Sequence, residues 1–138
     1  MLDTKWQAAL EGILERVGSE SGTVHLLGDD GLLGLVASVG IPPSLIPVIA
    51  SIPVGKGMAG LAVQRDAPVE SCNLQTDESG DVRPGSRATR LRGSVAVPIR
   101  DKAGLVRGCL GVGVVEERVY TDPEIERLLA EGSRLLEG

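Results

Sequence analysis

The sequence predicts an α+β fold in which one antiparallel sheet is flanked by helices. Three observations carry this prediction: a helix-periodic segment at each end of the chain, two pairs of β-rich runs joined by short turns, and a glycine-rich loop that enters a helix between them. Short turns join antiparallel strands, whereas parallel strands need long crossovers, so a doubly wound parallel sheet is not expected. With 138 residues and no repeat or linker, the chain is expected to form one domain over 1–138.

The two ends of the chain carry apolar residues at helical spacing. An amphipathic helix is expected over 1–18, where Gly18 ends it, and a closing helix over 121–137, where Thr121 or Asp122 caps it. The apolar stripes offer more surface than one sheet face needs, which predicts a homodimer built from these helices. The alternative is that both stripes are consumed inside one subunit. The stripe residues are Leu2, Leu10, Ile13, Leu128, Leu129 and Leu135.

Two hairpins are expected to form the centre of the sheet. The first joins 23–27 to 32–39 and the second joins 94–100 to 105–115, each through a four-residue turn that contains glycine and aspartate. In the second hairpin bulky residues alternate with small ones, so one sheet face is bulky and the other is bare. The bare face suits either the floor of a ligand pocket or close packing of a terminal helix, and we favour helix packing because every such fold needs it. The small residues are Ser94, Ala96, Pro98, Cys109, Gly111 and Gly113.

A glycine-rich run over 54–62, VGKGMAGLA, is expected to lead a loop into a short helix. It does not complete the phosphate-binding pattern, because Lys56 is followed by Gly57 rather than Ser or Thr, so a nucleotide hydrolase is not expected. A short strand over 68–72 follows. Residues 73–93 then lose periodicity, and a loop of this length in a compact domain is often functional.

The long loop contains most of the candidate ligand-binding residues. Its guanidinium groups suit a carboxylate or phosphate, because they present fixed, bidentate donors. Residues 82–107 hold six arginines and one lysine against one acid, although the whole chain has a net charge of -5. We therefore expect any ligand to have an anionic end and to bind between this loop and the sheet; the alternative is that the arginines are solvated and neutralised by nearby acids. The candidates are Arg87, Arg90, Arg92, Ser94, Cys72 and Asp77.

Composition argues against several other functions. The negative net charge disfavours nucleic-acid binding, and two aromatic residues leave few stacking surfaces for a flat cofactor, so no cofactor is identified. Two cysteines and one histidine are too few for a zinc site, and His25 is expected to be a packed or edge residue of a strand. No apolar run reaches the ~18 residues of a membrane span. We expect no metal, no nucleic-acid partner, no membrane partner and a cytoplasmic location.

Taken in order, these segments resemble the GAF domain family. The resemblance implies an antiparallel sheet of five or six strands, with terminal helices on one face and ligand-side helices and loops on the other. Members commonly sense small molecules or transmit signals through dimers, which implies a non-enzymatic sensory or regulatory domain, either a complete protein or an excised part of one. A PAS-like sensor is the nearest structural alternative, but it would less naturally provide both terminal helices and this glycine loop. The segments that carry the resemblance are 23–27, 31–40, 52–62, 67–69, 94–100, 104–114 and the closing helix.

One enzymatic branch of that family, the free methionine-(R)-sulfoxide reductases, has a similar glycine loop. In that branch a cysteine commonly occupies the place of Ala59, and another follows a Pro-Gly pair in the long loop, whereas Pro84 and Gly85 are followed here by no thiol. Thiol chemistry needs a thiolate nucleophile and usually a resolving partner. The missing loop thiols argue against this activity. Because the chain still contains Cys72 and Cys109, a thiol-dependent small-molecule reductase is kept as the alternative function, and it would depend on these two residues.

Overall fold

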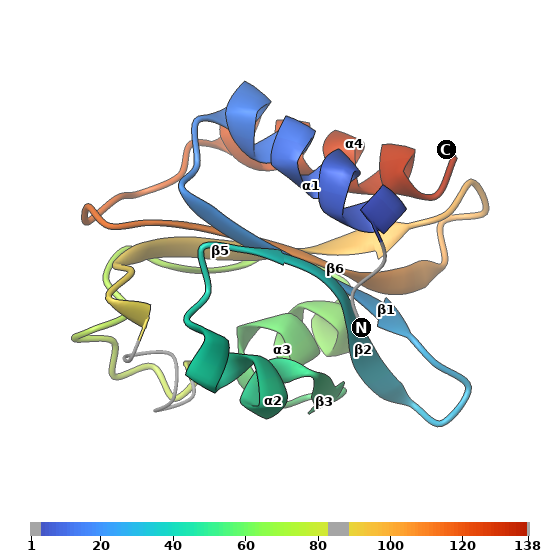
Figure 1. The fold of residues 1–138 in the computed structure, drawn as a ribbon, viewed down its shortest axis with the longest axis horizontal. Coiled ribbons are helices and arrows are strands. Elements are labelled where there is room, and N and C mark those ends of the chain that lie inside the picture. The colour runs from blue at the N-terminus through green and yellow to red at the C-terminus, as the bar shows by residue number, and fades with distance from the viewer. Residues whose placement is uncertain (1–3, 83–88, 138) are drawn as a thin grey trace.

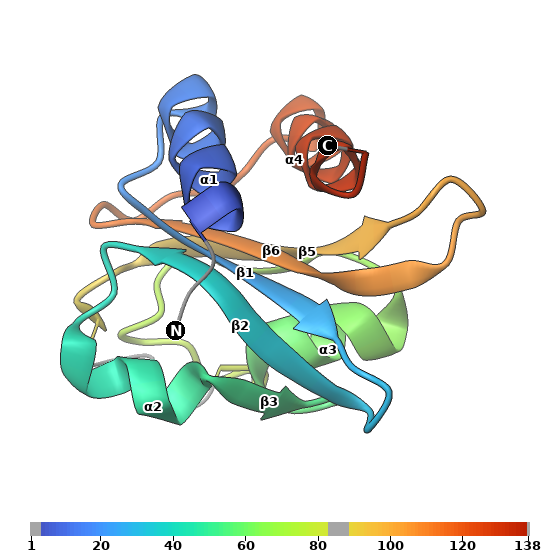
Figure 2. The ribbon, with the colours of Figure 1, turned by 45° about the vertical axis from the view of Figure 1, so that its right-hand side comes forward.

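A computed structural model describes residues 4–82 and 89–137 in three layers: two terminal helices, a six-stranded sheet, and a layer of short helices and loops (Figures 1 and 2). The strand order is β3-β2-β1-β6-β5-β4, and all the recorded pairings are antiparallel. The predicted α+β class and antiparallel sheet are therefore confirmed. In chain order the elements are α1 (Thr4–Val17), β1 (Ser21–Leu27), β2 (Leu32–Val39), a 3-10 turn (Pro43–Leu45), α2 (Ile46–Ile49), β3 (Ser51–Pro53), α3 (Gly57–Arg65), β4 (Val69–Ser71), β5 (Gly93–Arg100), β6 (Val106–Val114) and α4 (Asp122–Leu135).

The terminal helices α1 and α4 cover the bulky face of the sheet (Figure 1). α4 begins with a capping box, in which Thr121 Oγ1 accepts a hydrogen bond from Glu124 N and the Glu124 carboxylate accepts one from Thr121 N. Within the described ranges, no helix is long and apolar enough to cross a bilayer. The core beneath the two helices includes Leu10, Ile13, Leu14, Val24, Val95, Val97, Ile99, Leu110, Val112 and Leu128.

The apolar stripes of these two helices are largely buried inside the subunit. Leu10, Ile13, Leu128 and Leu135 are buried, Leu129 is half-buried, and Leu2 lies outside the described residues. The surplus of apolar surface that motivated a homodimer is therefore absent from the described part of the stripes. An ion pair also joins the helices, since Arg16 Nη2 lies 2.6 Å from the buried carboxylate of Glu131.

The opposite face of the sheet carries α2 and α3, and β3 pairs with β2 at the edge of the sheet. The glycine-rich run brings α3 close to the preceding chain, because a Cβ atom added at Gly60 would lie 2.5 Å from the carbonyl oxygen of Pro53. A second apolar cluster fills the space between α3 and the sheet. Its members are Leu33, Ile52, Ala62, Val63, Val69, Ala96 and Cys109.

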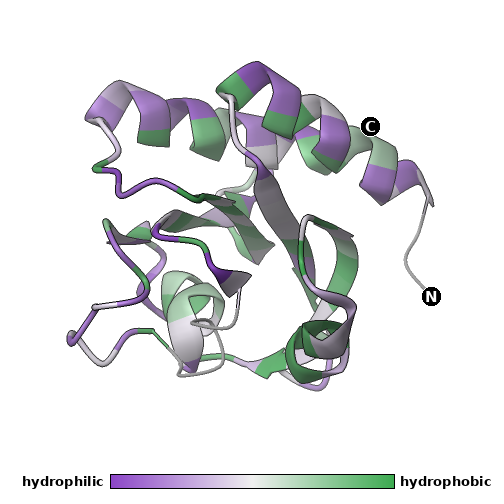
Figure 3. Cartoon of the chain, turned by 60° about the vertical axis from the view of Figure 1, so that its left-hand side comes forward, coloured by the Kyte–Doolittle hydropathy of each residue, from purple (hydrophilic) through white to green (hydrophobic). Residues whose placement is uncertain are grey.

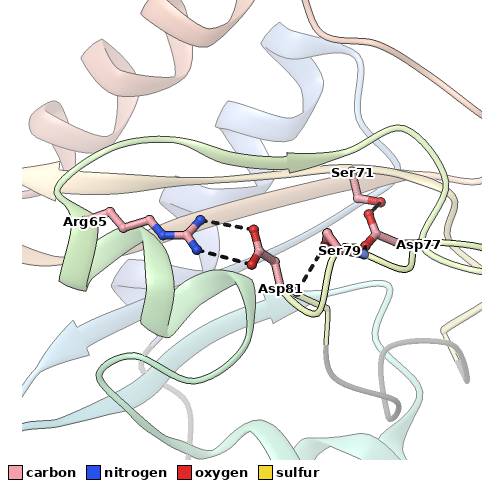
Figure 4. Close-up of polar contacts among 5 residues, drawn as sticks. All are labelled: Arg65, Ser71, Asp77, Ser79 and Asp81. Atoms are coloured by element: carbon pink, nitrogen blue, oxygen red, sulfur yellow. Dashed lines mark hydrogen bonds and ion pairs between the residues drawn. The ribbon is translucent and has the colours of Figure 1, made fainter.

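Two sets of polar contacts hold residues 73–82, the first part of the long loop, in place (Figure 4). Arg65 of α3 forms a bidentate ion pair with Asp81, at 3.0 and 3.2 Å. Asp77 accepts a hydrogen bond from Ser71 Oγ of β4 at 2.6 Å and another from Ser79 N at 2.9 Å. These contacts hold the loop beside α3 and β4, on the side of the sheet away from the terminal helices.

Candidate functional site

A cavity of about 270 Å³ lies between the sheet and the layer that contains α2 and α3. Its floor is formed by β1, β6 and β5, and its walls come from α2, the start of α3 and the long loop. The hydropathy colouring of Figure 3 shows α2 as mainly hydrophobic. An apolar lining with few polar groups is typical of small-molecule sites. The large apolar residues of the lining are Ile41, Leu45, Val48, Ile49, Ile52, Met58, Leu74 and Leu91.

Small residues on three neighbouring strands make the floor. Thr23 lies opposite Gly111, and Gly111 lies opposite Ala96. A Cβ atom added at Gly111 would lie 3.0 Å from Thr23 Oγ1, and one added at Gly113 would lie 2.9 Å from Leu91 Cδ1. Larger residues here would therefore take up the space of the cavity. The expectation that these small residues receive a terminal helix is wrong, because α1 and α4 rest on the opposite, bulky face.

His25 borders the cavity from β1 and is only 2% exposed. Its Nε2 lies 2.8 Å from the carbonyl oxygen of Ile49. Because a carbonyl oxygen only accepts, Nε2 carries the proton and Nδ1 is left as an acceptor. Nδ1 is buried and has no hydrogen-bond partner among the described residues. Burial lowers the pKa of His25, and the hydrogen bond to Ile49 opposes this shift in part, so the ring is neutral at pH 7.

The N-terminal end of α3 also borders the cavity, through Gly57, Met58 and Ala59. The N-cap residue Lys56 has the extended backbone of a cap, but its side chain makes no capping bond and the first turn contains no acid. The first intrahelical hydrogen bond runs from Gly60 N to Lys56 O at 3.1 Å. The three preceding amides have no acceptor in the part of the chain that the structure describes. Free amides and the helix dipole together give this end a partial positive charge.

The electrostatics of the cavity favour a neutral or anionic guest. None of the described residues that line it is an aspartate or a glutamate, and Lys56, whose side chain is exposed, is the charged member of the lining. The described residues also assemble no group of three side chains that could hold a metal ion. An anion would therefore meet donors at the end of α3 without facing a carboxylate in this lining.

The arginines predicted to bind a ligand do not line this cavity. Arg90 and Arg92 are exposed and outside its lining, and Arg87 lies outside the described residues. Ser94 does line the cavity, where its hydroxyl donates a hydrogen bond to the carbonyl oxygen of Val112 at 3.0 Å. The binding role of these residues stays a prediction.

The other two candidates from the loop region also lie outside the cavity lining. Cys72 is exposed, and Asp77 accepts the hydrogen bond from Ser71 that anchors the loop. The loop reaches the cavity instead through Thr89 and through Leu74 and Leu91, the two leucines of a mostly polar segment. Leucines in an otherwise polar loop are a sequence signal for this contact. No sequence pattern predicts that a ring nitrogen of a strand histidine lacks a hydrogen-bond partner.

The two cysteines are far apart. Burial raises the pKa of Cys109 to about 12. Cys109 lies opposite Pro98, whereas Ser71, the neighbour of Cys72, lies opposite Ser94. Four residues along a strand span about 13 Å, well beyond the ~7 Å between Cα atoms that a disulfide tolerates. The two thiols therefore do not form the nucleophile and resolving pair that the reductase alternative needs.

Comparisons with known proteins agree on one family and one fold. A family model described as GAF domain matches residues 3–133. The GAF domain of a phosphoenolpyruvate-protein phosphotransferase from Coxiella burnetii is similar at 18% identity and TM-score 0.77, over 95% of this chain and 77% of that one. Two free methionine-R-sulfoxide reductases are also similar at 18% identity. The type II enzyme from Thermoplasma acidophilum has a TM-score of 0.76 over 97% of this chain and 89% of that one. The enzyme from Neisseria meningitidis in complex with its substrate has a TM-score of 0.74 over 94% of this chain and 72% of that one. At these identities the structural likeness establishes the fold alone. Among curated proteins, none gives a significant match.

Proposed function

Because the chain belongs to the GAF domain family, we propose that it is a non-enzymatic sensory or regulatory domain that binds a small molecule in the cavity beneath its sheet. The observation that carries the proposal is the preformed cavity, whose lining is mainly apolar and includes the open end of α3. A bound ligand would supply acceptors for the free amides at the end of α3.

Ligand binding has a short physical route to the terminal helices. Val95 and Val112 border the cavity and also belong to the core beneath α1 and α4. A ligand that prefers one arrangement of the floor and the long loop shifts the population of that arrangement. Because one layer of sheet separates the cavity from the helices, this shift is passed to their packing.

We further propose that the signal leaves the domain through a homodimer, in the cytoplasm, where two unpaired cysteines are stable. A groove between α1 and α4 contains Trp6 beside the small residues Ala8, Ala9 and Gly12, which let another helix approach closely. We expect a dimer in light scattering at micromolar concentrations. A strictly monomeric species across that range would contradict this part of the proposal.

Native mass spectrometry of freshly purified protein tests the binding function. We expect a retained small molecule in the wild type and its loss in Gly111→Val, because the added side chain enters the cavity beside Thr23. Gly34→Val is the matched control, since a Cβ atom there meets nothing closer than 3.9 Å. If both folded variants retain the same molecule, the ligand binds elsewhere. If a wild-type domain binds nothing, even after incubation with a metabolite extract, the proposed function is wrong.

The thiol-dependent reductase is the second candidate, and the likeness to two reductases of that class favours it. The separation of the thiols and the high pKa of Cys109 oppose it. We therefore regard the reductase activity as the weaker of the two proposed functions, after small-molecule binding.

A further inference from the structure

We propose that a second pocket, on the opposite face of the sheet from the cavity, binds a phosphate dianion, either free or as the end group of a small metabolite. This pocket has a volume of about 180 Å³ and lies where the end of α1 faces the start of α4. The two helices run antiparallel, so these two ends lie at the same end of the molecule (Figure 1). The site is separate from the cavity, and the inference goes beyond the proposed function.

Three arginines among the described lining residues give the pocket its charge. Arg16 comes from the last turn of α1, Arg127 from α4, and Arg118 from the segment between β6 and α4. In the same described lining Glu124 is the one acid, and its carboxylate already accepts hydrogen bonds from Thr121 N and from Arg118. The pocket is therefore positive, although the whole chain has a net charge of -5.

Two of the guanidinium groups are held in place by their neighbours. Arg16 Nε and Nη2 donate to the Glu131 carboxylate at 3.2 and 2.6 Å. The Arg118 guanidinium lies 4.5 Å from the centre of the Tyr120 ring and forms an ion pair with Glu124. Each group keeps further N–H donors, because a guanidinium presents several of them in a fork. Groups that are already ordered lose less entropy when a ligand binds.

Arg127 is the uncommitted member of the three. It is exposed, and within the described part of the chain it makes no hydrogen bond and no ion pair. Glu124 and Glu131 lie one turn before and one turn after it on α4, yet each is bonded to another arginine. A cation that shares a pocket with two other cations is repelled by them, and a bound anion offsets this repulsion.

The set of donors favours a phosphate group over a carboxylate. A phosphate group offers three acceptor oxygens to guanidinium groups from three different segments, and its charge at pH 7 is about -1.5 to -2. A carboxylate has two oxygens and a single charge, so one arginine fork can satisfy it. At about 30 Å³ for each molecule, the pocket has the volume of about six waters, which suits a phosphate group with a few further atoms. Val17, Val112 and Leu128 supply apolar walls for a short carbon chain.

A matched set of anions tests the site. The probes are inorganic phosphate, methyl phosphate, propyl phosphate, methyl sulfate and acetate. Binding to the wild-type domain is measured at physiological ionic strength by calorimetry and by the chemical shifts of arginine Nε–H groups. We expect the phosphates to bind roughly tenfold tighter than methyl sulfate and acetate, which have a single charge. Tighter binding of propyl phosphate than of inorganic phosphate identifies an organic phosphate as the ligand, and the reverse order identifies free phosphate.

Three variants assign the contact. Arg127→Gln removes the uncommitted guanidinium, so we expect roughly tenfold weaker phosphate binding with little change in the urea midpoint. Lys102→Gln is the matched control, because it removes the same charge from the exposed turn between β5 and β6. Gly111→Val fills the cavity beneath the sheet, where the end of α3 also attracts anions. We expect both Lys102→Gln and Gly111→Val to bind phosphate as the wild type does.

Several outcomes would overturn this site. They are no phosphate binding at millimolar concentrations, acetate binding as tight as phosphate binding, and equal losses in Arg127→Gln and Lys102→Gln, which would indicate diffuse attraction to the surface. Loss of phosphate binding in a folded Gly111→Val domain would place the anion in the cavity instead. A wild-type domain that binds phosphate through Arg127 but retains no molecule in its cavity would uphold this site while the proposed function fails.

Discussion

At the scale of single residues, the buried imidazole of His25 ties the stability of the domain to pH. Burial lowers its pKa in the folded state, whereas the unfolded chain has the ordinary value of about 6.5. Between these two values the unfolded state binds more protons than the folded state. The contribution of His25 is therefore complete above pH ~6.5 and is lost as the pH falls toward the lowered pKa.

We predict that the urea midpoint of the wild-type domain falls between pH 7.5 and 5, and that His25→Gln removes most of this slope. The carboxylates of Asp101, Glu124 and Glu131 have lowered pKa values in the fold, each mainly through hydrogen bonds to its charged form. Their contribution is lost at lower pH, below about 4.5, and so does not obscure the histidine window. Parallel pH profiles for the two proteins above pH 5 would contradict the prediction.

At the scale of elements, the contact between α1 and α4 depends on one buried carboxylate. Glu131 of α4 accepts hydrogen bonds from Arg16 of α1 through both carboxylate oxygens, and its side chain is 5% exposed. The Arg16 guanidinium holds the pKa of Glu131 below its ordinary value. This pair fixes how the two helices lie against each other, and the helices are the part of the domain that we expect to carry its output.

We predict that Glu131→Gln lowers the free energy of unfolding by about 1–3 kcal/mol, because it weakens a buried, charge-assisted set of hydrogen bonds. Glu126→Gln, on the exposed side of the same helix, is the matched control and is expected to change stability by less than about 0.5 kcal/mol. Both values come from urea denaturation at pH 7. Equal effects of the two substitutions would show that the pair contributes nothing beyond a surface charge.

Element by element, hydrophobic periodicity predicted the terminal helices and the two hairpins, because each of these buries a regular face. The same pattern also separated a bulky sheet face from a bare one. The pattern could not predict which of the two faces the terminal helices cover. That choice depends on the size of the gap between the helices and the sheet, which side chains of matching size must fill. Bulky residues such as Val97, Ile99 and Leu110 fill that space, and the bare face is left to the cavity.

At the scale of the whole molecule, the candidate site was harder to predict than the fold. The arginine-rich loop is conspicuous in the sequence, yet it lines the cavity with Leu74, Thr89 and Leu91. Arg90 and Arg92 stay outside the lining. The polar features at and beside the cavity are a helix end without a cap and a buried, unpartnered nitrogen of His25. Both are properties of three-dimensional packing, because a hydrogen bond that is missing leaves no trace in residue type or spacing.

The whole-molecule arrangement of thiols leads to the last prediction, that the domain has no appreciable methionine sulfoxide reductase activity. Reduction of a sulfoxide by a thiol enzyme needs a thiolate that becomes a sulfenic acid and a second thiol that resolves it as a disulfide. Ala59 occupies the loop position of one expected cysteine, and Cys109, with a pKa of about 12, is almost entirely protonated at pH 7. Cys72 is exposed but has no thiol within disulfide reach.

The measurement is methionine formed from free methionine-(R)-sulfoxide, quantified by chromatography with dithiothreitol as the reductant. We expect the wild type, Cys72→Ser and Cys109→Ala to give the same rate as the buffer. Dithiothreitol is chosen because it can replace a missing resolving thiol. A negative result therefore shows that the domain lacks a competent nucleophilic thiol. Turnover by the wild type that disappears in Cys72→Ser would contradict the prediction and make the reductase the leading function. Turnover that survives both substitutions cannot come from these thiols, and repeating the assay after a further purification step separates a contaminant from the domain.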